Sequence, residues 1–279
     1  MTVFEALTAR PGMLGKPDSK RGLHIAGLLA FLPTAGILLI RIGINAPFAP
    51  HLPYSAVYDQ MASAAVLGPA IGAILVSVTT DDDVRLVALA FAGVFGLLSA
   101  IARLAVVPAS VSIVFATAAM VIAHVRGKFS ANTVTEGFVG VLFLAGVALS
   151  MAGGLGVEPA TMRRLGSITG LLAIGGVPVF VEWNRRTVIV GLVAGAAFTG
   201  FGLAAPFVTG AASLVGGGIV GVSLPVLIVA VIGGVTLIAT GIDRRTLDTT
   251  LAGLLILTAG VPATVPRGLA LLVGLAVLM

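Results

Sequence analysis

Cysteine is absent from the 279 residues, which excludes disulfides, thiolate metal sites, iron–sulfur clusters and cysteine nucleophiles. Histidine and aromatic residues are also scarce, at three histidines and 6% Phe, Trp and Tyr, so a histidine-rich cofactor site is hard to build. The sequence contains no H-E-x-x-H, G-x-S-x-G, P-loop or D-x-x-D pattern. We therefore expect no catalytic residues, no cofactor, no bound metal and no enzymatic activity.

Charge is the other scarce property, because only 10% of the residues are charged and 58% are hydrophobic. Residues 165–205 show how the apolar residues are arranged: two uncharged runs of 17 and 19 residues flank a turn that holds Glu182, Arg185 and Arg186. At 1.5 Å per residue, each run spans roughly 26 to 29 Å, close to the hydrocarbon thickness of a bilayer. This pattern predicts a transmembrane helical hairpin.

Similar runs recur along the chain and predict an all-α polytopic integral membrane protein, a bundle of nine or ten helices joined by short loops. Residues 1–22 form a polar, basic leader and residues 23–279 a single transmembrane domain. The expected helices are 23–40, 55–78, 84–102, 108–125, 137–155, 165–181, 187–205, 219–240 and 249–265. Two segments leave the number open: 206–218 is a loop or a re-entrant segment, and 268–279 is too short to span unless its helix begins before Arg267.

The basic residues predict how the chain is oriented. They are scattered singly or in pairs and form no stripe, so we expect no nucleic-acid partner despite the net charge of +5. With the N-terminus in the cytoplasm, eleven lie inside (Arg10, Lys16, Lys20, Arg21, Arg85, Arg126, Lys128, Arg185, Arg186, Arg244 and Arg245) and five outside (Arg41, Arg103, Arg163, Arg164 and Arg267). The positive-inside rule favours this orientation. The bias towards Arg, Ala, Val, Gly and Leu suggests a prokaryotic cell membrane.

Ionisable residues at membrane depth are costly, which makes each of them a functional candidate. Asp59 and Gln60 lie a few residues into the second expected helix, where they are candidates for a transport step. Asp59 alternatively lies at headgroup level beside Tyr54 and Tyr58. Glu182 is a third polar candidate, and its alternative role is that of an anchor in an interfacial turn.

Two further groups of polar residues have a structural and a functional interpretation. Asp81, Asp82 and Asp83 precede an apolar run, which predicts an N-cap and acidic first turn; three consecutive residues cannot all face one metal ion from a helix. His24 and His124 both fall near the inner boundary. They could share a metal or haem only if their helices are neighbours, and interfacial histidines are the simpler interpretation.

Prolines inside the expected helices are candidate helix breaks: Pro33, Pro69, Pro178, Pro225 and Pro262. Broken helices build substrate sites in transporters, although proline is also ordinary in membrane helices. Two of these prolines belong to similar segments, 171–181 and 254–265, each with a Gly-Val-Pro sequence. The segments enter from opposite sides, which is typical of an inverted repeat, but the match is short enough to be coincidence in a chain of this composition.

Three functions of different class remain. The favoured prediction is a structural or accessory subunit that packs against a membrane partner, which fits the lack of convergent polar groups. A small-solute or lipid transporter fits the kinked helices and Asp59, and an intramembrane lipid-modifying enzyme has the least support. The expected partners are the lipid bilayer and either another membrane protein or further copies of the chain. Polar side chains or unwound segments around one cavity would distinguish a transporter from a scaffold.

Overall fold

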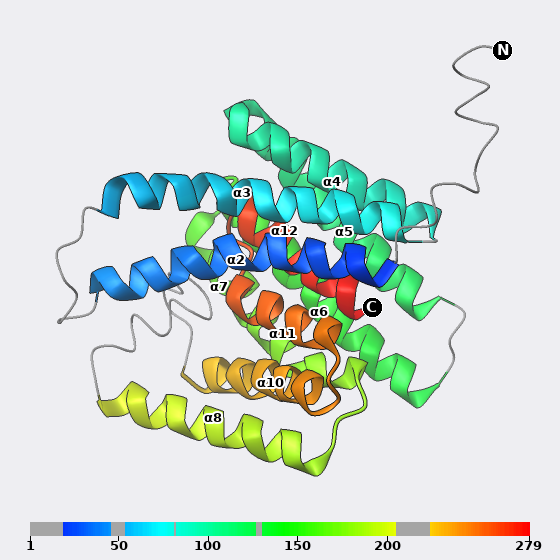
Figure 1. The fold of residues 1–279 in the computed structure, drawn as a ribbon, viewed down its shortest axis with the longest axis vertical. Coiled ribbons are helices and arrows are strands. Elements are labelled where there is room, and N and C mark those ends of the chain that lie inside the picture. Colours follow the sequence, from blue (N-terminus) through cyan, green and yellow to red (C-terminus); the bar gives the residue numbers. More distant parts are fainter. Residues whose placement is uncertain (1–18, 46–53, 81, 127–129, 205–223) are drawn as a thin grey trace.

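The computed structural model describes residues 19–45, 54–80, 82–126, 130–204 and 224–279 (Figure 1). These residues form helices and contain no strand. The α-helices are α2 (Ser19–Asn45), α3 (Tyr54–Thr79), α4 (Asp83–Ile101), α5 (Val106–Val125), α6 (Ala131–Gly154), α7 (Pro159–Gly176), α8 (Arg185–Ala204), α10 (Leu224–Asp243), α11 (Leu247–Ala259) and α12 (Val265–Leu278). Short 3-10 helices, η1 (Arg103–Ala105) and η2 (Val177–Phe180), precede α5 and follow α7.

Four of the described helical stretches are long and apolar enough to cross a membrane: α4, η1 with α5, α6 from Asn132, and α10. The all-α polytopic prediction is therefore confirmed. Helices are the expected solution because every backbone N–H and C=O must be paired within the segment when no water is present.

Local sequence sets where α4 begins. Asp82 is its N-cap, and its Oδ1 accepts hydrogen bonds from the backbone N–H of Val84 at 2.9 Å and of Arg85 at 3.0 Å. Asp83 follows in the first turn, where a negative charge interacts favourably with the helix dipole. The predicted cap is confirmed for these two residues, while Asp81 lies outside the described residues.

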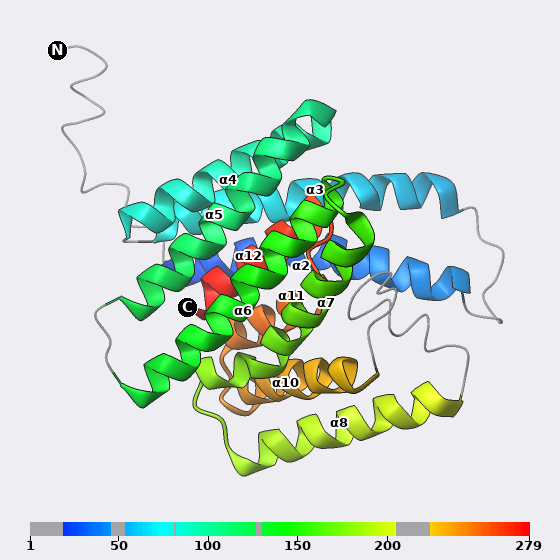
Figure 2. The same cartoon turned by 180° about the vertical axis from the view of Figure 1, so that it is seen from behind.

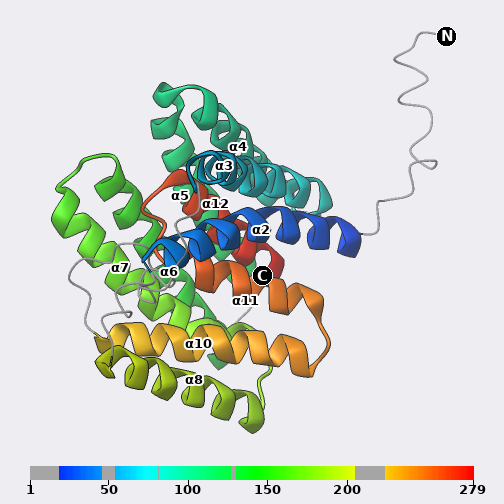
Figure 3. The same cartoon turned by 60° about the vertical axis from the view of Figure 1, so that its left-hand side comes forward.

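Helix α12 is the centre of the bundle. It packs against α2, α3, α4, α5 and α11 (Figure 3), and every residue from Gly268 to Leu275 is buried. Seen from behind, α5 lies across it (Figure 2). The helix begins at Val265, before Arg267, and its 14 residues span roughly 21 Å. A helix of this length does not cross a bilayer alone, but here the surrounding helices cover its sides in place of lipid.

A glycine allows a close helix crossing between α6 and α7. A Cβ built on Gly146 of α6 would lie 2.7 Å from both the backbone N and the Cα of Gly170 on α7. No side-chain movement relieves a contact with backbone atoms. The two helices therefore approach closely because residue 146 carries no side chain, whereas a Cβ on Gly170 would make only ordinary contacts, 3.9 Å from the Cα of Gly146.

The helix predicted over 249–265 is wrong at its end. Helix α11 stops at Ala259, and residues 260–264 form a non-helical connector before α12. Gly260 adopts φ 53° and ψ −101°, a conformation that residues with a side chain rarely adopt, and Pro262 lacks the N–H that a continuing helix requires. The other Gly-Val-Pro segment also ends an α-helix, because α7 stops at Gly176 and continues as η2.

The helices alternate in direction, which gives the bundle two ends. We call the end where α2 begins the amino-terminal face; it lies on the right in Figure 1 together with the start of α11 and the end of α12. Ion pairs joining His24 to Asp248, His124 to Glu136 and Glu182 to Arg244 lie at this face. The opposite face holds the turns from α4 to α5 and from α6 to α7, with Arg103, Glu158, Arg163 and Arg164.

Candidate functional site

Two cavities lie near the two ends of α12, and both are lined by residues of α4, α5 and α12. The cavity at the amino-terminal face has a volume of about 220 Å³ and is called here the Arg85 cavity. The cavity towards the opposite face has a volume of about 260 Å³ and is called the Ser110 cavity. The same three-helix interface thus opens at both ends of the bundle.

The Ser110 cavity is bordered by an unwound stretch of backbone. Ala263 and Thr264 of the connector line it, together with Ser99 of α4 and Ser110 of α5. Ser99 Oγ donates to the carbonyl of Gly96 at 2.7 Å and Ser110 Oγ to the carbonyl of Val106 at 2.8 Å, so each hydroxyl oxygen can still accept a hydrogen bond. Polar groups from three elements therefore surround one cavity.

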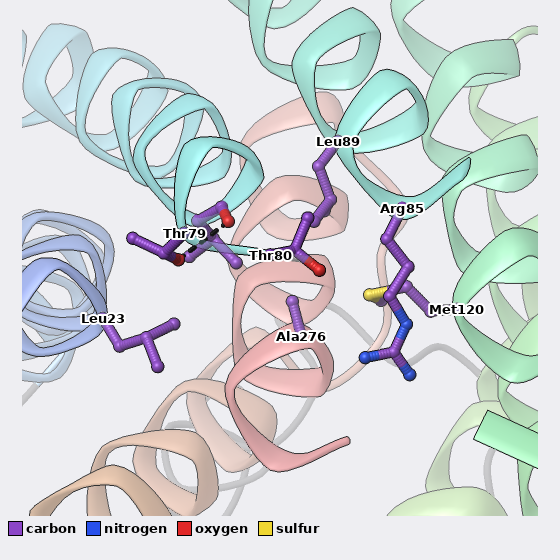
Figure 4. Close-up of a pocket in the computed structure, with 8 residues that line it drawn as sticks. Leu23, Thr79, Thr80, Arg85, Leu89, Met120 and Ala276 are labelled. Carbon is purple, nitrogen blue, oxygen red and sulfur yellow. Dashed lines mark hydrogen bonds between the residues drawn. The ribbon is translucent and has the colours of Figure 1, made fainter. Parts of the chain in front are cut away.

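The Arg85 cavity combines a cationic side chain with an otherwise mostly apolar lining. Arg85 points from the first turn of α4 towards Met120 of α5 and Ala276 of α12, and Thr79 and Thr80 lie across the cavity (Figure 4). The Nε atom of Arg85 is buried and has no hydrogen-bond partner. Among the residues that line the two cavities, Arg85 is the one with a charged side chain.

Closely packed residues separate the cavities. Along α5, Ile113, Ala116 and Thr117 lie between Ser110 and Met120, and their exposed fractions are 0%, 0% and 1%. Along α12, the buried stretch from Leu269 to Leu275 lies between the same two levels. In this conformation the two cavities are not continuous.

Ion pairs at the amino-terminal face join helices and do not line either cavity. His124 Nε2 lies 3.0 Å from Glu136 Oε2, and its ring also contacts Phe180 of η2 edge-on at 5.4 Å between centroids. His24 Nε2 lies 2.5 Å from Asp248 Oδ1. The two histidines thus have separate carboxylate partners, on α6 and α11.

Glu182, one of the polar residues singled out in the sequence, does not line either cavity. Glu182 is exposed at the surface, where its Oε2 accepts a hydrogen bond from Arg244 Nη2 at 3.1 Å. Asp59 and Gln60 belong to α3, but their side chains lie outside the described residues. No group of three His, Asp or Glu side chains able to hold a metal occurs in the part of the chain that the structure describes.

The prolines occupy three kinds of position. Pro33 and Pro69 lie inside continuous α-helices, α2 and α3. Pro225 is the second residue of α10, where its missing N–H has no helical partner to lose. Pro178 lies in η2 and Pro262 in the connector, so these two stand where α-helices end. Of the five, Pro262 is the one next in sequence to a described residue that lines one of these two cavities.

Arg85, Ser99 and Ser110 were missed by sequence reasoning. In the sequence, Arg85 contributes only to the predicted orientation in the membrane. The signal that could have identified it is its position just after an acidic N-cap and before a long apolar run. The serines carried no signal, because isolated serines in membrane helices usually bond to their own backbone. Ser99 and Ser110 become candidate site residues because they line the same cavity as Ala263 and Thr264 of the connector.

These apolar helices, with ion pairs at an end and a fully enclosed central helix, define a polytopic integral membrane protein. Residues 24–279 match an integral membrane family of unknown function (DUF8068), and the chain belongs to that family. No curated protein and no solved structure matches the chain.

Proposed function

We propose that the protein is a small-solute permease whose path follows the interface between α4, α5 and α12. The observation that carries the proposal is the pair of cavities at opposite ends of this interface, one of them lined by a non-helical connector. Non-helical backbone that lines a cavity presents groups able to bind a solute, as the unwound segments of many transporters do. A packed layer between two cavities is the arrangement that alternating access requires.

The cavity volumes limit the size of the solute. At about 220 and 260 Å³, both fall below the 300 to 1,000 Å³ range typical of sites for drug-sized ligands. The solute is therefore a small molecule or ion. We infer that it passes unchanged, because the described lining residues of the two cavities include no constellation of nucleophile, base or metal ligands.

The orientation of the permease follows from the basic residues at its two ends. Arg21, Arg85 and Arg126 lie at the amino-terminal face, with Arg185 and Arg186 at the start of α8 and Arg244 and Arg245 in the turn after α10. By the positive-inside rule this face is cytoplasmic, and the protein lies in a prokaryotic plasma membrane.

An accessory subunit is the second proposal, and the exposed apolar sides of α4 and α8 favour it. Phe91 of α4 is 56% exposed and Val193 of α8 is 63% exposed, and a partner helix would cover such surfaces. A lipid bilayer would cover these surfaces equally well, so they do not require a partner. Neither lipid nor a partner helix accounts for the connector beside the Ser110 cavity. The permease is therefore the better-supported function.

Filling the Ser110 cavity is expected to stop transport. Ser110 is 3% exposed and lines the cavity, so Ser110→Leu places a larger side chain where the solute would bind. In proteoliposomes, stopped-flow light scattering with salts of small anions and with neutral solutes is expected to show protein-dependent flux of at least one solute. Ser110→Leu should reduce that flux by about tenfold or more, which corresponds to the loss of one good contact.

Val111→Leu is the matched control, because Val111 is the next residue of α5 and is 44% exposed. It should leave the flux unchanged. Flux equal to that of protein-free liposomes for every solute, or a Ser110→Leu variant that transports as well as Val111→Leu, would contradict the proposal.

A further inference from the structure

The Arg85 guanidinium is the strongest unpaired polar feature of the cavities. Its Nε is buried without a hydrogen-bond partner, and none of the described residues forms an ion pair with it. A buried donor without an acceptor costs free energy, and the cost is greater when the donor is charged. A bound acceptor would remove that cost.

Neither of the described acidic residues at the start of α4 lines the cavity. Asp82 uses its Oδ1 to cap α4 through the backbone N–H groups of Val84 and Arg85. Asp83 is exposed and does not line the cavity. Among the described residues, the lining of the cavity therefore presents positive charge without a carboxylate.

The rest of the lining suits a small acceptor. Thr80 lies across the cavity from the guanidinium, with its hydroxyl directed inward (Figure 4). Thr79 Oγ1 donates to the carbonyl of Val76 at 2.9 Å and keeps its capacity to accept. Leu23, Leu89 and Met120 close the remaining sides with apolar groups, which strengthens electrostatic attraction by excluding water.

We propose that the Arg85 cavity binds an oxyanion, a phosphate or carboxylate group, held by the guanidinium and the Thr80 hydroxyl. Arginine matches such groups with two parallel N–H···O bonds, a geometry that lysine does not offer. Binding itself stands independently of transport. If the Arg85 cavity is also the cytoplasmic binding site of the transported solute, that role rests on the proposed permease. The transported solute is then a small anion.

The acceptor has two sources, a free anion in the cytoplasm or the phosphate of an anionic lipid, and the experiment separates them. The full chain is placed in nanodiscs of phosphatidylcholine, and equilibrium dialysis measures the binding of radiolabelled inorganic phosphate and of acetate. In parallel, native mass spectrometry counts phosphatidylglycerol retained from nanodiscs that contain it. We expect saturable binding of about one oxyanion or one anionic lipid per chain.

Arg85→Gln should weaken that binding roughly ten- to a hundred-fold, the range for losing a hydrogen bond with a charged partner. Arg85→Lys should keep part of it. Arg103→Gln removes an exposed arginine from the opposite face and should bind as the wild type does. If Arg85→Gln fails to fold, Thr80→Val provides the second test and should weaken binding several-fold while Arg103→Gln does not.

The proposed site would be overturned if the protein bound neither phosphate nor acetate and retained no phosphatidylglycerol. It would also be overturned if Arg85→Gln, or Thr80→Val if Arg85→Gln does not fold, bound as tightly as Arg103→Gln. The two proposals fail differently: flux without oxyanion binding removes the oxyanion site and leaves the permease, whereas binding without any flux removes the permease and leaves the site.

Discussion

Gly146→Val is expected to lose most of the folded protein. Even the first carbon of the new side chain would lie 2.7 Å from backbone atoms of Gly170, and valine adds two further methyl groups. Because α6 and α7 can relieve the clash only by moving apart, the cost is roughly 3 kcal/mol or more, at the upper end of overpacking effects. The measurement is the fraction of monodisperse protein in mild detergent and its thermal unfolding midpoint.

Gly200→Val is the control, since it adds the same residue to helix α8 where no atom lies within 4 Å of the new Cβ. The intrinsic effect of valine on a helix is the same in both variants. The difference between their unfolding midpoints therefore measures the clash where α6 crosses α7. Equal unfolding midpoints for the two variants would show that α6 and α7 do not pack as described.

Gly260→Ala is expected to abolish transport. At φ 53° and ψ −101°, a side chain strains the backbone by about 1 to 3 kcal/mol. The chain would relax by changing the path of residues 261–264, which displaces Ala263 and Thr264 from the Ser110 cavity. We expect flux in proteoliposomes to fall by about tenfold or more, with a smaller loss of stability.

Gly156→Ala separates strain from function. Gly156 also has a positive φ, 96°, but it lies in the loop between α6 and α7, outside the cavity lining, with nothing within 4 Å of a new Cβ. It should lower the unfolding midpoint and leave flux close to that of the wild type. A Gly260→Ala variant that transports normally would show that the connector does not shape the path.

The sequence predicted the parts of the fold that depend on local pattern. The hairpin over 165–205 appears as α7, η2 and α8, because an apolar run of bilayer length has no alternative to a helix in lipid. The cap at Asp82 was equally local, since its hydrogen bonds join residues two and three positions apart.

Features that depend on distant packing could not be predicted. The segment 268–279 is too short to span, and nothing within it indicates that α2, α3, α4, α5 and α11 enclose it. Helix α11 ends before Gly260 because of the backbone conformation of that glycine, and the apolar pattern of 249–265 does not predict this conformation. Arg85 becomes a site residue only because α5 and α12, from elsewhere in the chain, close the space around it.

Single cysteines test most directly whether the two cavities open to opposite sides of the membrane, and the natural chain has no cysteine to remove. Thr264→Cys lies in the Ser110 cavity and Thr80→Cys in the Arg85 cavity, while Thr117→Cys lies between them at 1% exposure. With a membrane-impermeant maleimide, we expect Thr264→Cys to react in intact cells, Thr80→Cys to react only in inverted vesicles, and Thr117→Cys to react in neither. Labelling of Thr264→Cys and Thr80→Cys from the same side, or of neither from any side, would contradict a path along α4, α5 and α12.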